Sequence, residues 1–270
     1  MFINTNVGAM NAHRNLSSSN TAMNKTMEKL SSGYRINRAA DDAAGLAISE
    51  KMRFQINGMT QAQRNAQDGI SLIQTAEGAL TETHAMLQRI NTLANQSKNG
   101  TYSTSDRTKL NLEVTQLVAE INNIASGTKF NGISLLSTTG TIRFQTGVNT
   151  GDTISVTTKG MQTAKLGLTA GVSIATVTGA GLAITAVEKA IEAVSTQRAT
   201  FGAVQNRLEH TVNNLGVNKE NLSAAHSRIR DADMAAEMTS FTKNQILVQA
   251  GTSMLAQANS VPQNVLKLLG

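Results

Sequence analysis

The sequence predicts a mainly α-helical protein of long helices with one small β-hairpin. Apolar residues make up 40% of the 270 residues, but aromatic residues make up only 3%. A compact globular core normally relies on aromatic side chains, because each buries a large area. The only proline is Pro262, so the preceding backbone meets no obstacle to long helices. Apolar residues also recur at heptad spacing over long stretches, which is typical of helices that pack side by side.

The two chain ends carry thin apolar stripes at helical spacing. Neither stripe could bury enough area alone to offset the entropy lost on ordering it. Both ends therefore need a partner, which is either the other end or another copy of the chain. The terminal packing residues predicted from these stripes are Ile3, Val7, Met10, Met27, Leu30, Met238, Phe241, Val248 and Leu255.

Residues 36–48 read "INRAADDAAGLAI", with two adjacent aspartates in a run of small residues. Asp41 and Asp42 could act as a general acid and base, but neighbours on a helix point about 100° apart, and no nucleophile lies near them. The simpler interpretation is a pair of negative charges that favours a helix beginning around Ala43.

Heptad spacing predicts a helix over residues 59–98, followed by a loop at 97–106 and a second helix. Either Ser105 or Asp106 is the predicted N-cap of that second helix. Gly127 is its predicted end. The apolar positions that define the second helix are Leu110, Val114, Leu117, Ile121 and Ile124.

The pattern changes to strand-like alternation over residues 130–160. The runs "TIRFQ" and "TISVTT" flank a turn at "GVNTGD", which predicts a β-hairpin. Residues 161–181 are rich in Gly, Ala and Thr, and we expect them to be loop-like.

The strongest periodicity follows this loop and predicts a helix of about 50 residues, roughly 75 Å long. That length without internal stops is typical of a coiled coil or a long bundle. The register is less regular at "RIRDAD" (228–233), but helix propensity persists there. The predicted helix seam comprises Val187, Val194, Phe201, Leu208, Leu215, Leu222 and Ile229.

Composition and motifs argue against several function classes. The chain has no cysteine and a net charge of +6, with no two Lys or Arg residues adjacent, so it lacks a nucleic-acid groove of dense charge. No stretch is long and apolar enough to span a membrane. Its four histidines are far apart in the sequence. A phosphate-loop pattern at 127–134 fails because Ile133 replaces the required lysine. We therefore predict no catalytic, cofactor-binding or metal-binding residues and no enzyme activity.

Long segments at both ends closely resemble bacterial flagellins. The resemblance covers roughly residues 1–135 and 182–270. The segments that carry it are "MEKLSSGYRINRAADDAAGLAISEKMR" (27–53), "AQDGISLIQTAEGALTETHAMLQRINTLANQS" (66–97), "KENLSAAHSRIRDADMAAEM" (219–238) and "MLAQANSVPQNVLKLL" (254–269).

The resemblance implies a domain organisation. Residues 1–44 and 228–270 would pair as a terminal coiled-coil domain in the filament core. Residues 45–227 would form a long antiparallel helical coiled-coil rod with a β-hairpin around 133–160, and no outer variable domain would be present.

By the same resemblance, "INRAADDAAGLAI" lies at the connection between the two domains, and "RIRDAD" is the return strand. A hypothesis of our own is that Arg228 and Arg230 pair with Asp41 and Asp42. The residues predicted to form this inter-domain connection are Arg38, Asp41, Asp42, Arg228, Arg230 and Asp231.

The implied function is that of a structural subunit, which self-assembles as a helical homopolymer into the extracellular flagellar filament for swimming motility. The implied partners are the type III flagellar export system, an export chaperone at the C-terminal region, and the flagellar cap and hook–filament junction proteins. The nearest alternative is a hook–filament junction protein. A basic nucleoid-binding protein is a more distant one, and steeply salt-dependent DNA binding would support it.

The resemblance also implies recognition of the monomer by the host Toll-like receptor 5 (TLR5). The alternative is that the same residues serve packing between subunits, and both roles can hold. The matching positions are Leu87, Gln88, Arg89, Leu93 and Glu113.

Overall fold

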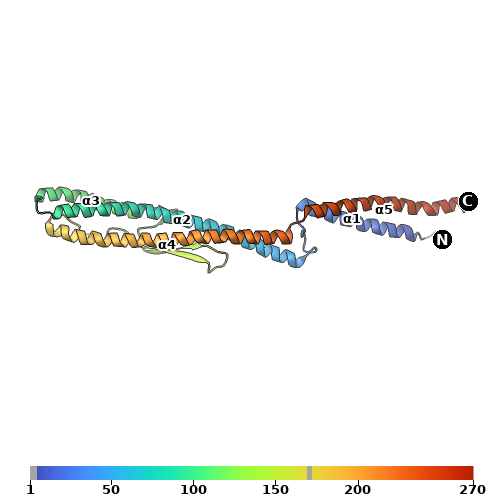
Figure 1. The fold of residues 1–270 in the computed structure, drawn as a ribbon, viewed down its shortest axis with the longest axis horizontal. Helices are drawn as coiled ribbons and strands as arrows, with labels where there is room; N and C mark the ends of the chain where they lie inside the picture. Colours follow the sequence, from blue (N-terminus) through green and yellow to red (C-terminus); the bar gives the residue numbers. More distant parts are fainter. Residues whose placement is uncertain (1–4, 169–171, 270) are drawn as a thin grey trace. The chain divides into compact units, whose positions relative to one another are not determined.

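A computed structural model describes residues 5–168 and 172–269, and it is mainly α-helical with a small β-hairpin region, as predicted (Figure 1). The predicted packing residue Ile3 lies outside the described residues. The elements in chain order are α1 (Val7–Ser32), α2 (Ala43–Lys98), α3 (Thr104–Gly127), β1 (Lys129–Phe130), β2 (Ile133–Ser134), β3 (Gly140–Gln145), β4 (Thr153–Thr158), α4 (Val177–Arg230) and α5 (Met234–Leu269).

The chain divides into two compact units, which we describe separately. Residues 1–56 together with 220–270 form what we call the terminal unit, and residues 57–219 form the central unit.

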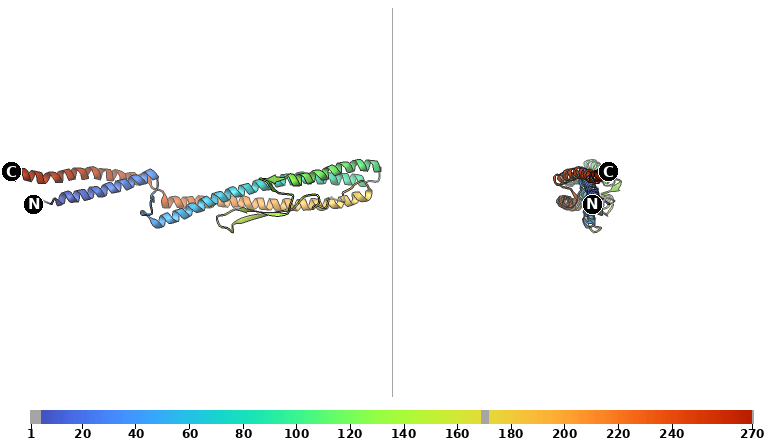
Figure 2. Two further views of the ribbon diagram at one scale, coloured as in Figure 1. Left: turned by 180° about the vertical axis from the view of Figure 1, so that it is seen from behind. Right: turned by 90° about the vertical axis from the view of Figure 1, so that its right-hand side faces the viewer.

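In the terminal unit, α1 and α5 lie side by side in antiparallel directions, with the N- and C-termini at the same end of the pair (Figures 1 and 2). At that end the Asn6 side-chain amide donates to the Ala258 carbonyl (2.8 Å). At the other end, Lys29 forms an ion pair with Glu237 (3.7 Å).

Only one thin stripe is covered between these two helices. Leu30, Phe241, Val248 and Leu255 are half-buried, and no residue of α1 is fully buried. The other predicted packing residues that the structure describes are exposed, namely Val7, Met10, Met27 and Met238.

In the terminal unit, local contacts explain where α1 and α4 end and where α2 and α5 begin. Gly33 ends α1 in the left-handed conformation (φ 73°), and its N–H donates to the Lys29 carbonyl. Helix α2 begins at Ala43, as predicted, because the Asp42 carboxylate accepts the Gly45 N–H (2.8 Å). The expectation that helix continues through 228–233 was wrong: α4 ends at Arg230, and Asp233 then caps α5 through the Ala235 N–H (2.9 Å).

The central unit is built on α2, α3 and α4, which lie side by side (Figure 2). Along α4 the predicted seam is buried from Val187 to Leu215, and it packs with buried residues of α2 such as Ile73, Leu80 and Leu87. The last two seam residues, Leu222 and Ile229, belong to the terminal unit and are half-buried.

Helix α3 ends at Gly127, as predicted, but its cap differs from both predicted residues. Ser103 is the N-cap, and its hydroxyl accepts the Asp106 N–H (3.3 Å) and donates to the Asp106 carboxylate (2.7 Å). The Ser103 hydroxyl therefore caps the helix, and the acidic residue occupies the third helical position rather than the cap.

Two antiparallel ribbons follow α3. Asn131 and Gly132 join β1 to β2 with positive φ angles of 48° and 80°, the conformation that an Asn-Gly hairpin turn requires. The predicted hairpin is confirmed as β3 and β4, which pair from Gly140↔Thr158 to Gln145↔Thr153.

The second hairpin packs against α2 at glycines. A methyl group at Gly69 would lie 3.1 Å from the Phe144 ring, and one at Gly58 would lie 3.0 Å from Val148. The side chains of Asn65 and Gln197 donate to hairpin carbonyls of Gln145 (3.0 Å) and Thr157 (2.9 Å).

Gly69 and Gly78 on α2 provide a matched comparison, because a methyl group at Gly78 would meet nothing within 4 Å. Gly78→Ala is expected to raise the free energy of unfolding by about 1 kcal/mol through helix propensity. Gly69→Ala is expected to lose this gain, because the new methyl group crowds Phe144. Chemical denaturation of both variants measures the difference, and equal gains would contradict the close packing at Gly69.

Between β4 and α4, residues 159–168 and 172–176 are irregular, as expected, but they contribute to the core. Among them, the apolar residues Met161, Leu166, Leu168 and Ile174 are buried. The Ile174 N–H donates to the Asn111 side chain (2.9 Å), and the Ser97 hydroxyl donates to the Ile174 carbonyl. Helix α4 begins at Val177, so the predicted loop of 161–181 extends a few residues too far.

Candidate functional site: the connector of the terminal unit

Two short segments, residues 33–42 and 231–233, join the α1–α5 pair to the adjoining ends of α2 and α4, and we call them the connector. Their backbones pair directly. The Arg35 N–H donates to the Arg230 carbonyl (2.7 Å), and the Ala232 N–H donates to the Gly33 carbonyl (2.9 Å). Between these bonds lies a β-bridge that joins Tyr34 to Asp231. This pairing takes the place of helical hydrogen bonds and explains why α4 ends at Arg230.

Arg230 is the centre of the connector. Its side chain is only 14% exposed, and it donates to the Glu50 carboxylate (2.7 Å). The guanidinium also lies over the Tyr34 ring, 4.7 Å from the ring centroid. Its Nε is buried and has no hydrogen-bond partner among the described residues. Arg35 reinforces the junction by donating to the Ile229 carbonyl (2.7 Å).

The hypothesis that Arg228 and Arg230 pair with Asp41 and Asp42 is wrong. Arg230 pairs with Glu50 instead. Arg228 is exposed and has no side-chain bond or ion pair among the described residues. Both aspartates have other partners: Asp42 accepts the Gly45 N–H, and Asp41 contacts Lys25 and N–H groups of its own loop.

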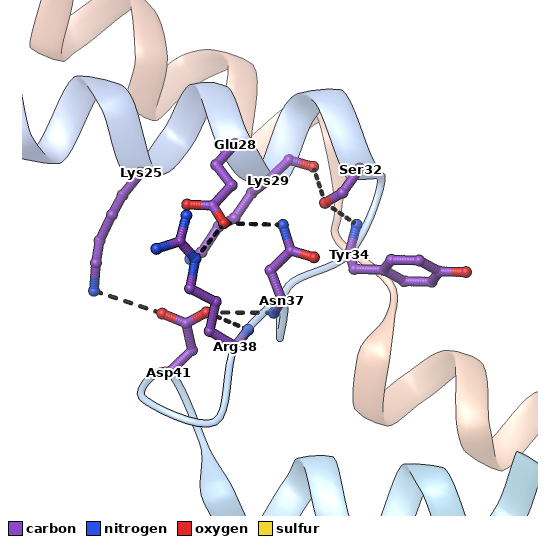
Figure 3. A network of polar contacts seen from close by, with 8 residues as sticks. All are labelled: Lys25, Glu28, Lys29, Ser32, Tyr34, Asn37, Arg38 and Asp41. Atoms are coloured by element: carbon purple, nitrogen blue, oxygen red, sulfur yellow. Dashed lines mark hydrogen bonds and ion pairs between the residues drawn. The ribbon is translucent and has the colours of Figure 1, made fainter.

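Asp41 folds the connector loop back onto α1 (Figure 3). Its carboxylate accepts the N–H groups of Arg38 (3.1 Å) and Asn37 (3.3 Å) and forms an ion pair with Lys25 (3.5 Å). The Arg38 N–H is the main reason that the pKa of Asp41 is lowered, with contributions from Asn37 and Lys25.

Glu28 of α1 makes a second attachment to the same loop, also drawn in Figure 3. Its carboxylate accepts hydrogen bonds from the Arg38 guanidinium (2.7 Å) and the Asn37 side-chain amide (3.3 Å). Behind the loop, Ile36 is buried and a methyl group on Gly45 would lie 2.8 Å from it. The loop is therefore held by specific polar contacts on one side and by close packing on the other.

Five of the six residues predicted for the connection meet at this site. Arg38 and Asp41 hold the loop, Asp42 caps α2, Arg230 is the hub, and Asp231 contributes its backbone bridge. Sequence reasoning missed Lys25, Glu28, Tyr34, Arg35 and Glu50. The one local signal was the Gly-Tyr-Arg sequence at 33–35, where a helix-ending glycine precedes an aromatic and a cationic residue.

The lowered pKa of Asp41 predicts a pH-dependent loop. A carboxyl group whose folded pKa is depressed adds stability above its ordinary pKa, near 3.9 in unfolded chains. That stability is lost as the pH falls through the lower folded value. The protection factors of the Asn37 and Arg38 amides, which compare exchange with the intrinsic rate at the same pH, should therefore fall on acidification in the wild type. In Asp41→Asn these factors should already be low at neutral pH and change little, and an unchanged wild-type profile in this variant would refute the assignment.

A second group of predicted residues lies in the central unit. Arg89 of α2 donates to the Glu113 carboxylate of α3 (2.7 Å), and this bond raises the pKa of Arg89. The Gln88 amide lies 3.0 Å from the His84 ring. Leu87 and Leu93 are only 0% and 1% exposed. A partner that approaches this surface therefore meets the polar residues, and the two leucines support them from the core.

Residues 5–168 and 172–269 contain no group of three or more His, Asp or Glu side chains that could hold a metal ion. Within the same residues, no helix has the length and apolar character needed to cross a membrane.

Comparison with known proteins agrees with this architecture. Residues 3–141 match the model of the bacterial flagellin N-terminal helical region, and residues 184–269 match that of the C-terminal helical region. This chain belongs to the bacterial flagellin family. Flagellins are structural proteins of the flagellar filament, so this member is not an enzyme.

Full-length relatives of this flagellin share about half of its residues. The flagellin of Halalkalibacterium halodurans is 55% identical over 271 residues, and that of Bacillus subtilis is 51% identical over 303 residues. The flagellar filament 33 kDa core protein of Treponema phagedenis is 51% identical over 287 residues. In all three cases the match covers 100% of both chains.

Solved structures show the same fold. The crystal structure of Bacillus cereus flagellin is 36% identical with a TM-score of 0.52, and the match covers 60% of this chain and 94% of that one. A putative flagellar hook-associated protein from Vibrio parahaemolyticus aligns with a TM-score of 0.61 at 13% identity, over 71% of this chain and 100% of that one. The latter similarity concerns the fold alone.

Proposed function

We propose that this flagellin builds the extracellular filament for swimming motility by self-assembly through α1 and α5. The exposed apolar surface of these two helices carries the proposal. Met10 and Met254 are 65% and 66% exposed, and no residue of α1 is fully buried. Exposed apolar surface of this kind marks an interaction site.

Helix α5 needs to be covered on more than its α1 side. Phe241 and Val248 are half-buried, but Met238, Ile246 and Leu247 are exposed. Successive helical residues differ by about 100°, so these three side chains point in different directions around the axis. A helix with apolar residues on several sides is normally surrounded. Neighbouring copies of the same helix pair supply that cover in our proposal.

The proposed domains follow from this. Residues 1–44 with 228–270 form the terminal coiled-coil domain of the filament core, and residues 45–227 form the helical rod with the hairpin around 133–160. Contacts between unlike surfaces of successive subunits do not close, so they generate a helical homopolymer. The two units of the structure divide the chain 12 residues further from the N-terminus and 8 residues further from the C-terminus.

We further propose export of the unfolded chain through the flagellar type III system. Two features support this route. The chain has no cysteine, so no disulfide hinders unfolding. The α1–α5 pair buries only a thin stripe, so little apolar burial opposes its separation and unfolding. The proposed partners are an export chaperone at the C-terminal region, the cap at the growing tip and the hook–filament junction proteins.

Electron microscopy tests the assembly proposal. The purified monomer is mixed with short filament seeds in neutral buffer, and the length of the seeds is followed. Elongation is the expected result. Monomers that bind the hook end without extending would support the alternative function, that of a hook–filament junction protein. Monomers that do neither would overturn both functions.

We also propose that the monomer is a ligand of TLR5, which recognises the surface formed by Gln88, Arg89 and Glu113 above Leu87 and Leu93. Arg89 is accessible and held in place by Glu113. An arginine fixed by a bond on its own surface loses less freedom on binding, which favours recognition.

Arg89→Ala is expected to reduce receptor signalling by the monomer about tenfold or more, because an interface arginine often contributes 2 kcal/mol or more. A reporter-cell assay of TLR5 signalling measures the effect. Arg207→Ala on α4 is the matched control, since Arg207 is exposed and has no side-chain bond among the described residues. Equal potency of both variants would exclude Arg89 from the receptor contact.

A further inference from the structure

The exposed methionines of this flagellin that the structure describes all lie in the terminal unit, where Met23 and Met52 are half-buried. The chain has 11 methionines and no cysteine, so methionine sulfur is its only oxidisable sulfur. In the described residues, the methionines among the exposed large apolar side chains all belong to the terminal unit. They are Met10, Met27, Met234, Met238 and Met254, and we call them the exposed methionines.

The central unit shows the opposite situation. Met161 is 1% exposed within the core, and Met59 and Met86 are half-buried. None of the exposed large apolar side chains described in the central unit is a methionine. Since oxidation of methionine requires access to its sulfur, the same reagent should modify the terminal unit first.

The antiparallel register places most exposed methionines at matching levels of α1 and α5. Asn6 meets Ala258, which brings Met10 and Met254 to the same level near the chain ends. Lys29 meets Glu237, which brings Met27 and Met238 to the same level near the connector. Oxidation would therefore alter the apolar surface of the helix pair at both of its ends.

We propose that the exposed methionines are modification sites for two-electron oxidants such as peroxides, and that their oxidation blocks assembly of the free subunit. In the reaction with hydrogen peroxide, the thioether sulfur forms a bond to one peroxide oxygen and the O–O bond breaks. The sulfur loses two electrons and becomes a sulfoxide, both peroxide oxygens are reduced, and the departing oxygen takes the proton of the transferred oxygen and leaves as water. The product replaces a flexible apolar side chain by a polar one.

The consequence rests on the proposed assembly through α1 and α5. A sulfoxide at a subunit contact would have to lose its water on docking without a hydrogen-bond partner prepared for it, which opposes assembly. The central unit keeps its core, because Met161 is shielded. Subunits already in a filament are protected, since their neighbours cover the same methionines.

The test treats the monomer with hydrogen peroxide, removes the oxidant and measures extension of filament seeds. We expect growth to be lost while the helical circular dichroism of the chain persists. Peptide mass mapping should find the exposed methionines oxidised before Met161, and oxidised more slowly in filaments than in monomers. Treatment with both methionine sulfoxide reductases should restore growth, since the sulfoxide is reversible.

A variant that carries Met10→Leu, Met27→Leu, Met234→Leu, Met238→Leu and Met254→Leu gives the decisive comparison, because leucine preserves volume and helix propensity. Its rate of seed extension after peroxide should equal its own rate before peroxide, whereas the control Met161→Leu should lose extension after peroxide as the wild type does. Oxidised wild type that extends seeds at the untreated rate would overturn the proposal, as would equal oxidation of Met161 and Met10. Failure of the untreated wild type to extend seeds would refute assembly itself, while the mass mapping would still decide the site selectivity.

Discussion

Phe201→Ala should lower the free energy of unfolding of the central unit by about 3–5 kcal/mol, the usual cost of removing a buried phenylalanine side chain. Phe201 lies in the middle of the α4 seam with 0% exposure, and it is among the largest fully buried side chains of the described chain. The cost has two parts, since the lost apolar contacts are accompanied by a cavity between packed helices that cannot fully close.

Denaturant unfolding followed by circular dichroism measures this loss. Phe54→Ala is a matched control, because Phe54 is 67% exposed and the same atoms are removed from a surface position. The control should change the free energy of unfolding by less than about 0.5 kcal/mol, as is usual for surface substitutions. A loss of unfolding free energy in Phe201→Ala as small as that in Phe54→Ala would mean that α4 does not pack through this seam.

Arg230→Ala is expected to release the connector. The substitution removes a charged hydrogen bond to Glu50 and the cation–π contact with Tyr34, and together these contribute about 2–4 kcal/mol. The N–H groups of Arg35 and Ala232 take part in the backbone pairing around Arg230. Their hydrogen exchange should accelerate about tenfold or more, because tenfold corresponds to 1.4 kcal/mol in a local opening equilibrium.

Two further variants separate the contributions of Arg230. Arg228→Ala removes an arginine two residues away that has no side-chain partner in the described chain, so it should leave exchange at Arg35 and Ala232 unchanged. Arg230→Lys keeps the positive charge but loses the planar group that stacks on Tyr34, and it should give an intermediate rate. A wild-type rate in Arg230→Ala would show that the backbone pairing alone holds the connector.

The elements that could be predicted from the sequence are those with a regular residue spacing or a local signal. The seam from Val187 to Leu215 is buried because each residue recurs at the spacing that faces the same neighbours. The β3–β4 hairpin and the helix starting at Ala43 were also predictable, since alternation and capping are local properties. By contrast, the burial of Met161 and Ile174 has no periodic signal, because an irregular segment presents its side chains at irregular intervals.

The position of the connector in the chain was predicted correctly, but the residues that pair within it were not. Arg230 pairs with Glu50 rather than with Asp41 or Asp42, and Glu50 lies 180 positions away in the sequence. Both aspartates are instead satisfied by nearby N–H groups, which compete well because they are held within the same turn. For α1 and α5, the spacing identified the apolar residues, but their final neighbours belong to other copies in our proposal.

The short link between α2 and α3, residues 99–103, has a consequence for folding kinetics. It lets those two helices meet by closing a small loop, whereas 78 residues (99–176) separate the end of α2 from the start of α4, and the ion pair between Arg198 and Glu77 spans still more of the chain. Loop-closure entropy grows with the length of intervening chain, and non-local pairing slows folding. The α2–α3 hairpin should therefore form the folding nucleus, and α4 should join it in the later, rate-limiting step. In the export that we propose, the chain would then complete its core only after α4 has left the channel.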